Sequence, residues 1–76
     1  MIDIAALTEA DKGREVRYAT VYAAMEYGKI TSWNDEFIFV RYHLRIMANG
    51  DRQPRYGETS EGTRPETLTF TDEEDI

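Results

Sequence analysis

Apolar and charged residues alternate with a period of two over residues 14–22, which read REVRYATVY. A period of two is typical of a β-strand that packs one face on a core and leaves the other face in solvent. We therefore expect Val16 and Tyr18 to face the core, while Glu15 and Arg17 face solvent.

The strongest strand pattern covers residues 27–42, which read YGKITSWNDEFIFVRY. Two runs of β-branched and aromatic residues flank Asn-Asp-Glu, a sequence with turn chemistry, so this segment predicts an antiparallel hairpin. Gly28 is expected where the first strand bends sharply. The alternation places one set of side chains on the core face: Ile30, Ile38, Val40 and Tyr42. It places another set on the outer face: Trp33, Phe37, Phe39 and Arg41.

The strand pattern weakens after Tyr42. The strand can continue with Leu44 and Ile46 on the core face, but a polar stretch rich in Pro and Gly follows. Such a composition predicts a long loop near 44–63. The acidic end of the chain, residues 72–76, is expected to be a disordered tail.

Two short helical turns frame the predicted strands. Thr8 and Asp11 have the spacing of a capping box, and Gly13 can end that turn. Pro65 can open a second turn, which delivers the chain into a last strand at residues 68–70.

This order of elements predicts an all-β protein, a small SH3-like barrel of about five antiparallel strands with short helical turns, in a single domain over residues 1–71. Closing the sheet removes the edges that would otherwise pair with other chains. An open antiparallel sheet is the alternative that the pattern allows.

Composition limits the chemistry that 76 residues can carry. The chain contains no Cys and one His, which excludes disulfides, a cysteine-based zinc site and a site of several histidines. It has no run of about 20 apolar residues and no signal-peptide pattern. We therefore expect a soluble intracellular protein that needs no metal or cofactor and no membrane.

The net charge of −6 comes largely from the C-terminus. Four of the fifteen acidic residues lie at 72–75, which leaves eleven acidic against nine basic residues in the rest of the chain. Overall acidity argues against generic DNA binding. A short acidic tail does not make a DNA mimic either, because such tails are usually solvated.

No group of residues predicts catalysis. Asp35 and Glu36 are neighbours in a turn, so their carboxylates diverge instead of converging on one bond. His43 has no serine motif to activate, and the five glycines are too scattered for a phosphate loop. The sequence therefore predicts a binding protein and not an enzyme.

Two sets of residues are candidates for contact with a partner. Aromatic side chains beside an arginine are typical of interface hot spots and also stack on single-stranded bases. Arginines of the long loop can contact phosphates or acidic protein surfaces. The competing interpretations are that the loop covers the aromatic residues and that its charges are simply solvated. The candidate residues are Trp33, Phe37, Phe39, Arg41, Arg45, Arg52, Arg55 and Tyr56.

Three segments carry a resemblance to a known group: DKGREVRY at 11–18, GKITSWND with FIFVRY at 28–42, and RPETLTF at 64–70. Together they resemble uncharacterised small SH3-like proteins encoded by tailed bacteriophages and prophages. The resemblance implies an SH3-like fold and action in the cytoplasm of a bacterial host, and it implies no activity. The region from 43 to 62 is longer here than in that group.

The leading hypothesis is a non-enzymatic accessory protein that binds a host or phage protein, and so inhibits a host defence or redirects a host enzyme. The alternatives are a nucleic-acid-binding SH3-like module and an acidic DNA-mimic inhibitor. A homodimer through the aromatic face would turn the proposed partner site into a self-interface.

Overall fold

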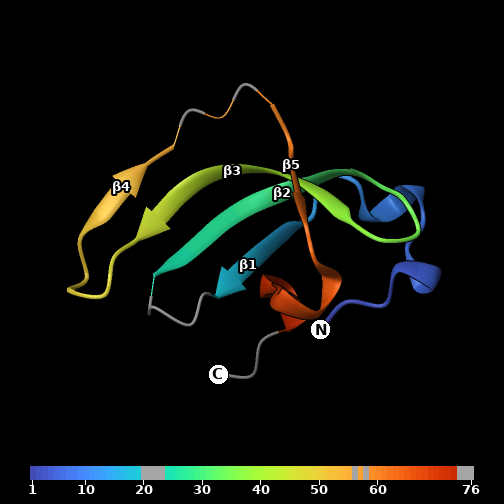
Figure 1. Cartoon of the computed structure of the whole chain (residues 1–76), viewed down its shortest axis with the longest axis horizontal. Helices are drawn as coiled ribbons and strands as arrows, with labels where there is room; N and C mark the ends of the chain where they lie inside the picture. Colours follow the sequence, from blue (N-terminus) through green and yellow to red (C-terminus); the bar gives the residue numbers. More distant parts are fainter. Residues whose placement is uncertain (20–23, 56, 58, 74–76) are drawn as a thin grey trace.

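The computed structural model describes residues 1–19, 24–55, 57 and 59–73. Six antiparallel strands form one sheet, and the helical segments in the described residues are single 3-10 turns. The strands are β1 (Glu15–Ala19), β2 (Met25–Trp33), β3 (Ile38–Ile46), β4 (Arg52–Pro54), β5 (Glu61–Thr63) and β6 (Leu68–Phe70) (Figure 1). The turns are η1 (Ile4–Ala6), η2 (Glu9–Asp11), η3 (Pro65–Thr67) and η4 (Thr71–Glu73). Within these described ranges, no helix is long and apolar enough to span a bilayer.

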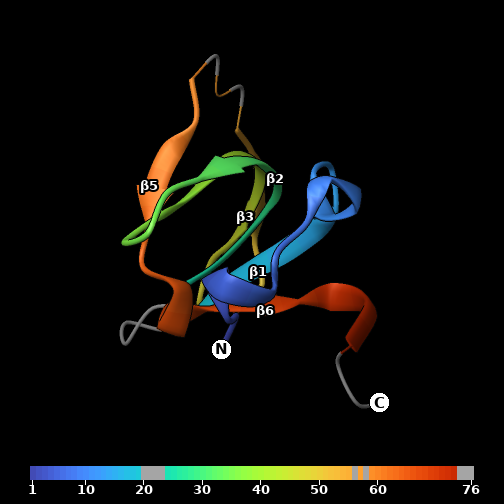
Figure 2. The same ribbon diagram turned by 90° about the vertical axis from the view of Figure 1, so that its right-hand side faces the viewer.

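The sheet has the strand order β4-β3-β2-β1-β6. Both β4 and β5 pair with the same edge of β3: β4 pairs with residues 44–46 and β5 with residues 38–40. The turn η3 joins β5 directly to β6, so the two ends of the sheet are linked across the core. Figure 2 shows the resulting curled sheet, with β5 and β6 on different sides of it. This arrangement confirms the predicted all-β fold of a small SH3-like barrel.

The core is a thin cluster inside the curled sheet. Five aliphatic side chains from four strands are almost fully buried: Val16, Ile30, Ile38, Val40 and Leu68. Ile2, Tyr42 and Phe70 complete the cluster. Each such side chain contributes roughly 1.5–3 kcal/mol when it is fully buried, so a small number of residues carries most of the stability. The predicted core positions of the hairpin and of Val16 are confirmed.

An extra residue in β2 corrects the prediction for Trp33. Ile30 pairs with Val40 and Ser32 pairs with Phe39, so Thr31 has no residue opposite it in β3 and forms a β-bulge. The bulge places Trp33 opposite Ile38, and the indole packs against the core cluster. The expectation that Trp33 shares the outer face with Phe39 is therefore wrong, because a bulge reverses the alternation on which it was based.

A second bulge, in β3, corrects the prediction for Leu44 and Ile46. Tyr27 pairs with Leu44 and Gly28 pairs with Tyr42, so His43 is the extra residue. Beyond it, Leu44 and Ile46 lie on the outer face, where the core face was predicted. The intervening Arg45 points to the inner side.

The segment predicted to be a long loop near 44–63 contains more strand than expected. β3 continues to Ile46, and the stretch that follows supplies both β4 and β5. Each of these two strands has three residues, and they contain Pro54 and Gly62, so neither shows the alternation that marks a strand in sequence. Tyr56 lies outside the described residues.

Arg14 ties the start of the barrel to its end. Its guanidinium donates to Asp11 at 2.7 Å, to Asp72 at 2.7 Å and to Glu73 at 3.2 Å. It also lies 3.5 Å from the centre of the Phe70 ring, in cation–π geometry. Asp72 and Glu73 therefore belong to the ordered η4, although the sequence predicts that a disordered tail begins at residue 72. Residues 74–76 are outside the described part.

Asp11 also completes the predicted cap of η2. Its carboxylate accepts a hydrogen bond from the backbone N–H of Thr8 at 2.8 Å. This hydrogen bond, and secondly the bond from Arg14, lowers the pKa of Asp11 below its ordinary value of 3.8.

Gly28 should not tolerate a side chain. A Cβ at this position would lie 2.6 Å from the Arg41 carbonyl oxygen and 2.9 Å from the Tyr42 Cα. These are backbone atoms, which cannot move aside without breaking the β2–β3 pairing. We predict that Gly28→Ala lowers the free energy of unfolding by about 3 kcal/mol, measured by urea denaturation. The exposed β2 variant Ser32→Ala is the control and should stay within about 0.5 kcal/mol of the parent protein.

Acid should weaken the Arg14 cluster through Asp11. A folded-state pKa below the unfolded value means that Asp11 stabilises the fold above pH 3.8, and that this contribution is lost as the pH falls through the lowered folded value. We predict that stability falls more steeply with decreasing pH in the parent protein than in Asp11→Asn. Urea denaturation between neutral pH and pH values below 3.8 measures both slopes. Equal slopes in the two proteins would contradict the assignment.

Candidate partner-binding surface

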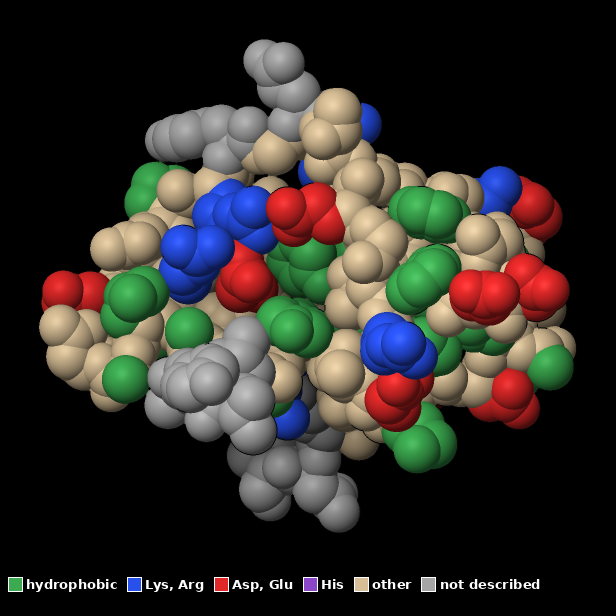
Figure 3. All heavy atoms as spheres, viewed as in Figure 1, with side chains coloured by type: hydrophobic (Ala, Val, Ile, Leu, Met, Phe, Trp, Pro, Cys, Tyr) green, Lys and Arg blue, Asp and Glu red, His purple; other side chains and the backbone are tan. Residues whose placement is uncertain are grey.

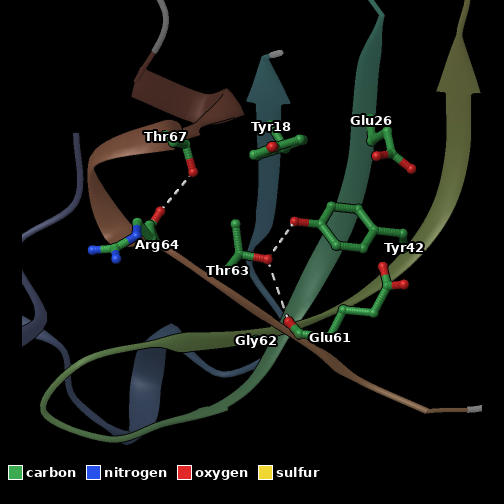
Figure 4. A pocket seen from close by; sticks show the side chains of 8 residues that line it. All are labelled: Tyr18, Glu26, Tyr42, Glu61, Gly62, Thr63, Arg64 and Thr67. Carbon is green, nitrogen blue, oxygen red and sulfur yellow. Dashed lines mark hydrogen bonds between the residues drawn. The ribbon is translucent and has the colours of Figure 1, made fainter.

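A pocket of about 400 Å³ lies between three strands and the β5–η3 segment (Figure 4). Tyr18 comes from β1, Glu26 from β2 and Tyr42 from β3. The other lining residues are Glu61, Gly62, Thr63, Arg64 and Thr67. The pocket is therefore built where the strands on the inner side of the sheet meet the segment that closes the barrel.

Tyr42 is the most deeply placed polar group of this pocket. Its hydroxyl shares a hydrogen bond of 2.7 Å with the hydroxyl of Thr63, and its ring meets the edge of Tyr18 with the centroids 6.3 Å apart. Burial raises the pKa of Tyr42 to about 12. The phenol is therefore neutral over the physiological range and is not available as a base.

Glu26 gathers the arginines on the inner side. Its side chain is 13% exposed and accepts hydrogen bonds from Arg55 and, at 3.4 Å, from Arg45. Arg55 also donates to both carboxylate oxygens of Glu61, at 3.2 and 3.3 Å, and this pairing contributes most to raising the pKa of Arg55. Its guanidinium lies 5.5 Å from the Tyr42 ring centre.

This network balances two carboxylates with two guanidiniums. Figure 3 shows the same tendency over one whole face, where basic side chains lie beside acidic ones. Among the described residues, no group of three or more His, Cys, Asp or Glu side chains is arranged to hold a metal ion. The arrangement therefore suits a structural role, in which Arg45 and Arg55 hold β3 and the following segment against β2.

The other face of the sheet has a different composition. From the bulge at Thr31 to the open end of the β2–β3 hairpin, cross-strand pairing aligns three rows of side chains on this face. The first row is Glu15, Lys29 and Arg41. The second is Arg17, Tyr27, Leu44 and Pro54. The third is Ala19, Met25, Ile46 and Arg52. We call this three-row face of β1–β4 the outer surface.

Four half-buried apolar side chains adjoin one another on the outer surface: Met25, Tyr27, Leu44 and Ile46. The surface has two hollows, one of about 550 Å³ beside Lys29, Arg41 and His43, and one of about 300 Å³ beside Tyr27, Leu44, Ile46 and Arg52. Both hollows border Glu15. Its carboxylate oxygen Oε2 lies 3.3 Å from the Nε2 of His43.

The basic residues differ in the contacts that hold them. Within the part of the chain that the structure describes, ion pairs with carboxylates hold Lys12, Arg14, Arg45, Arg55 and Arg64. Arg17 donates to the Met25 sulfur at 3.6 Å. Lys29, Arg41 and Arg52 are exposed and form no ion pair with any residue that the structure describes. These three lie on the outer surface together with Arg17. The three rows of the outer surface thus contain four basic residues and one acidic residue, Glu15, in a chain of net charge −6.

The structure separates the residues that the sequence proposed as one partner-binding set. Trp33 packs against the core, and Arg45 and Arg55 belong to the inner ion pairs. Phe37 and Phe39 are half-buried beside β5, where the Cβ of a side chain at Gly62 would lie 3.3 Å from the Phe39 ring. Arg41 and Arg52 are the two candidates that reach the outer surface.

Sequence reasoning missed most of the outer surface. Met25, Tyr27 and Lys29 occupy alternate positions of β2, and this spacing is visible in the sequence. The outward orientation of Leu44 and Ile46 is not visible in the sequence, because the bulge at His43 reverses the face on which they lie.

No protein-family model matches this chain, and no curated protein and no solved structure matches it.

Removing the Tyr42 hydroxyl should have two separable effects. Tyr42→Phe loses the bond to Thr63, and we predict a fall of about 1 kcal/mol in the free energy of unfolding at neutral pH. In the parent protein, the raised pKa of Tyr42 also means that stability falls between pH 10 and about 12, because the unfolded state ionises first. Tyr42→Phe should lack the part of this alkaline fall in stability that comes from ionisation of Tyr42.

Urea denaturation in alkaline buffers, with tyrosinate absorbance followed in parallel, measures both effects. Thr63→Val is the matched control, since it removes the same hydrogen bond but keeps the phenol and should keep the alkaline fall. Ionisation of Tyr42 near pH 10 in the folded protein would contradict its burial.

Proposed function

We propose that this chain is a small non-enzymatic binding module that engages a partner protein through the outer surface. The observation that carries the proposal is the coincidence of apolar side chains and unpaired cations on one face. Met25, Tyr27, Leu44 and Ile46 offer area that a partner can desolvate, and Lys29 and Arg41 offer charge for orientation.

Protein is favoured over nucleic acid as the partner by the distribution of charge. Among the residues that the structure describes, eleven acidic and five basic residues lie outside the outer surface. Affinity for a polyanion comes from neutralising many phosphates, and a face with four basic residues offers few such contacts. A DNA mimic is also disfavoured, because Asp11, Glu26 and Glu61 are paired with arginines.

The biological setting of the proposal comes from the resemblance to small phage and prophage proteins. It supports a partner in the bacterial cytoplasm, encoded by the host or by the phage. A rigid barrel on a functional surface acts sterically, so the expected consequence is inhibition or redirection of a host enzyme or defence protein.

Affinity capture from bacterial lysate tests the proposal. The tagged parent protein is compared with Lys29→Gln/Arg41→Gln, which removes two of the four basic residues of the outer surface without placing like charges beside Glu15. The charge-matched control is Lys12→Gln/Arg64→Gln, whose wild-type side chains lie in exposed ion pairs away from this face. We predict that the parent and the control capture the same protein with or without nuclease, and that the outer-surface variant loses at least about 90% of it, equivalent to a tenfold loss of affinity.

Two results would contradict the proposal. Capture that disappears after nuclease treatment would assign the surface to nucleic acid. Equal capture by both double variants would show that the outer surface is not the binding site. Urea denaturation of each variant establishes that a loss of capture is not a loss of folding.

A further inference from the structure

We infer that the partner presents an extended acidic segment to the outer surface, with carboxylates over Lys29 and Arg41 and apolar side chains over the Tyr27–Leu44 and Met25–Ile46 rows. This inference rests on the proposed function and specifies the chemistry of the partner. The segment that covers the outer surface belongs to another protein and not to a second copy of this chain.

Along β2 and β3 the outer surface has a basic end and an apolar end, while Arg17 and Arg52 flank the apolar rows on β1 and β4. Lys29, Tyr27 and Met25 are alternate residues of β2, so their side chains leave the same face about 7 Å apart, which is twice the rise per residue of a strand. Pairing with β3 sets Arg41 beside Lys29, Leu44 beside Tyr27 and Ile46 beside Met25. Each step along β2 therefore has the same chemical character on both strands.

An extended peptide along β2 repeats its own side chains at the same interval. A segment with an acidic residue, then an apolar residue two positions on and another two positions further, would match the three rows in order. The hollow beside Lys29 and Arg41 has room for a carboxylate, and the hollow beside Leu44 and Ile46 has room for an apolar side chain.

Glu15 adds a repulsive element to this match. It borders both hollows, so a carboxylate placed between the basic and apolar ends would lie near its charge. At the basic end, Lys29 and Arg41 border the same hollow as Glu15 and offset this repulsion, whereas over the Tyr27–Leu44 row they do not. Specificity of this kind depends on the unfavourable contact as well as the favourable ones.

A second copy of this chain is a poor occupant by the same reasoning. In a two-fold symmetric contact the same face meets itself. With the axis along β2, Glu15 would face Arg41 of the other copy, but Lys29 would oppose its own copy. With the axis across the strands, the basic row would oppose an apolar row. Burying unpaired charge costs more than the apolar contact returns.

Titration with synthetic peptides, followed by backbone amide shifts in heteronuclear NMR, tests the inference on the full chain. The probe is a capped peptide with two Glu followed by Leu and Phe at alternate positions and Ser between them. The matched peptide has the same composition with both Glu in the middle. A third probe is an oligothymidylate of the same length.

We expect the segregated peptide to shift amides of residues 25–29 and 41–46, with a Kd of about 1 mM or lower at low salt. Binding should weaken about tenfold for the central-Glu peptide and for Lys29→Gln/Arg41→Gln, and Lys12→Gln/Arg64→Gln should bind as the parent does.

Four results would overturn the inference: no shifts at about 5 mM peptide, shifts outside the outer surface, equal binding of the two peptides, or tighter binding of the oligothymidylate. The first three leave the proposed function standing if lysate capture still depends on Lys29 and Arg41, so the two failures are distinguishable.

Discussion

The one-residue insertion at His43 is the constraint on which both faces of this protein depend. It lies where β3 passes closely over Gly28, and it changes the direction of every later side chain of β3. Without it, Arg45 would point outward and Leu44 inward. With it, Arg45 reaches Glu26 on the inner side, and Leu44 and Ile46 join Met25 and Tyr27 on the outer surface. One backbone irregularity thus creates the inner ion pairs and the outer apolar cluster together.

The distribution of charge follows from this division. On the inner side, Glu26 and Glu61 are placed where Arg45 and Arg55 can pair with them. On the outer side, cross-strand pairing aligns Lys29 with Arg41, and Glu15 is the single carboxylate in that row. The net charge describes an acidic protein. In the folded sheet, however, arginines and carboxylates form ion pairs on the inner side, and the outer side has more basic than acidic residues. Recognition depends on this local arrangement because the fields of distant exposed charges are screened within about 10 Å at ordinary ionic strength.

A domain of this size depends on contacts between its chain ends. Among the described residues, eight buried hydrophobic side chains form the core, and three of them, Ile2, Leu68 and Phe70, come from the ends of the chain. The backbone N–H of Ile2 donates to the Pro65 carbonyl oxygen at 3.0 Å, and Arg14 joins η2 to η4. These contacts close the barrel over a core that the central hairpin alone would leave open, as expected where little surface can be buried.

The local structure of this protein can be predicted from its amino-acid sequence. Alternation identified β1 and the β2–β3 hairpin, and capping and proline chemistry identified η2 and η3, because those signals lie within a few residues of one another. The tertiary structure decided which face Trp33, Leu44 and Ile46 occupy and which carboxylate pairs with Arg14 or Arg55. It also revealed β4 and β5, whose three-residue sequences carry no alternation. The physical reason is that a bulge adds a residue without changing composition or propensity, yet it reverses every face beyond it. Ion pairs such as Arg14–Asp72 join residues far apart in the chain, and only the folded, curled sheet brings those residues together.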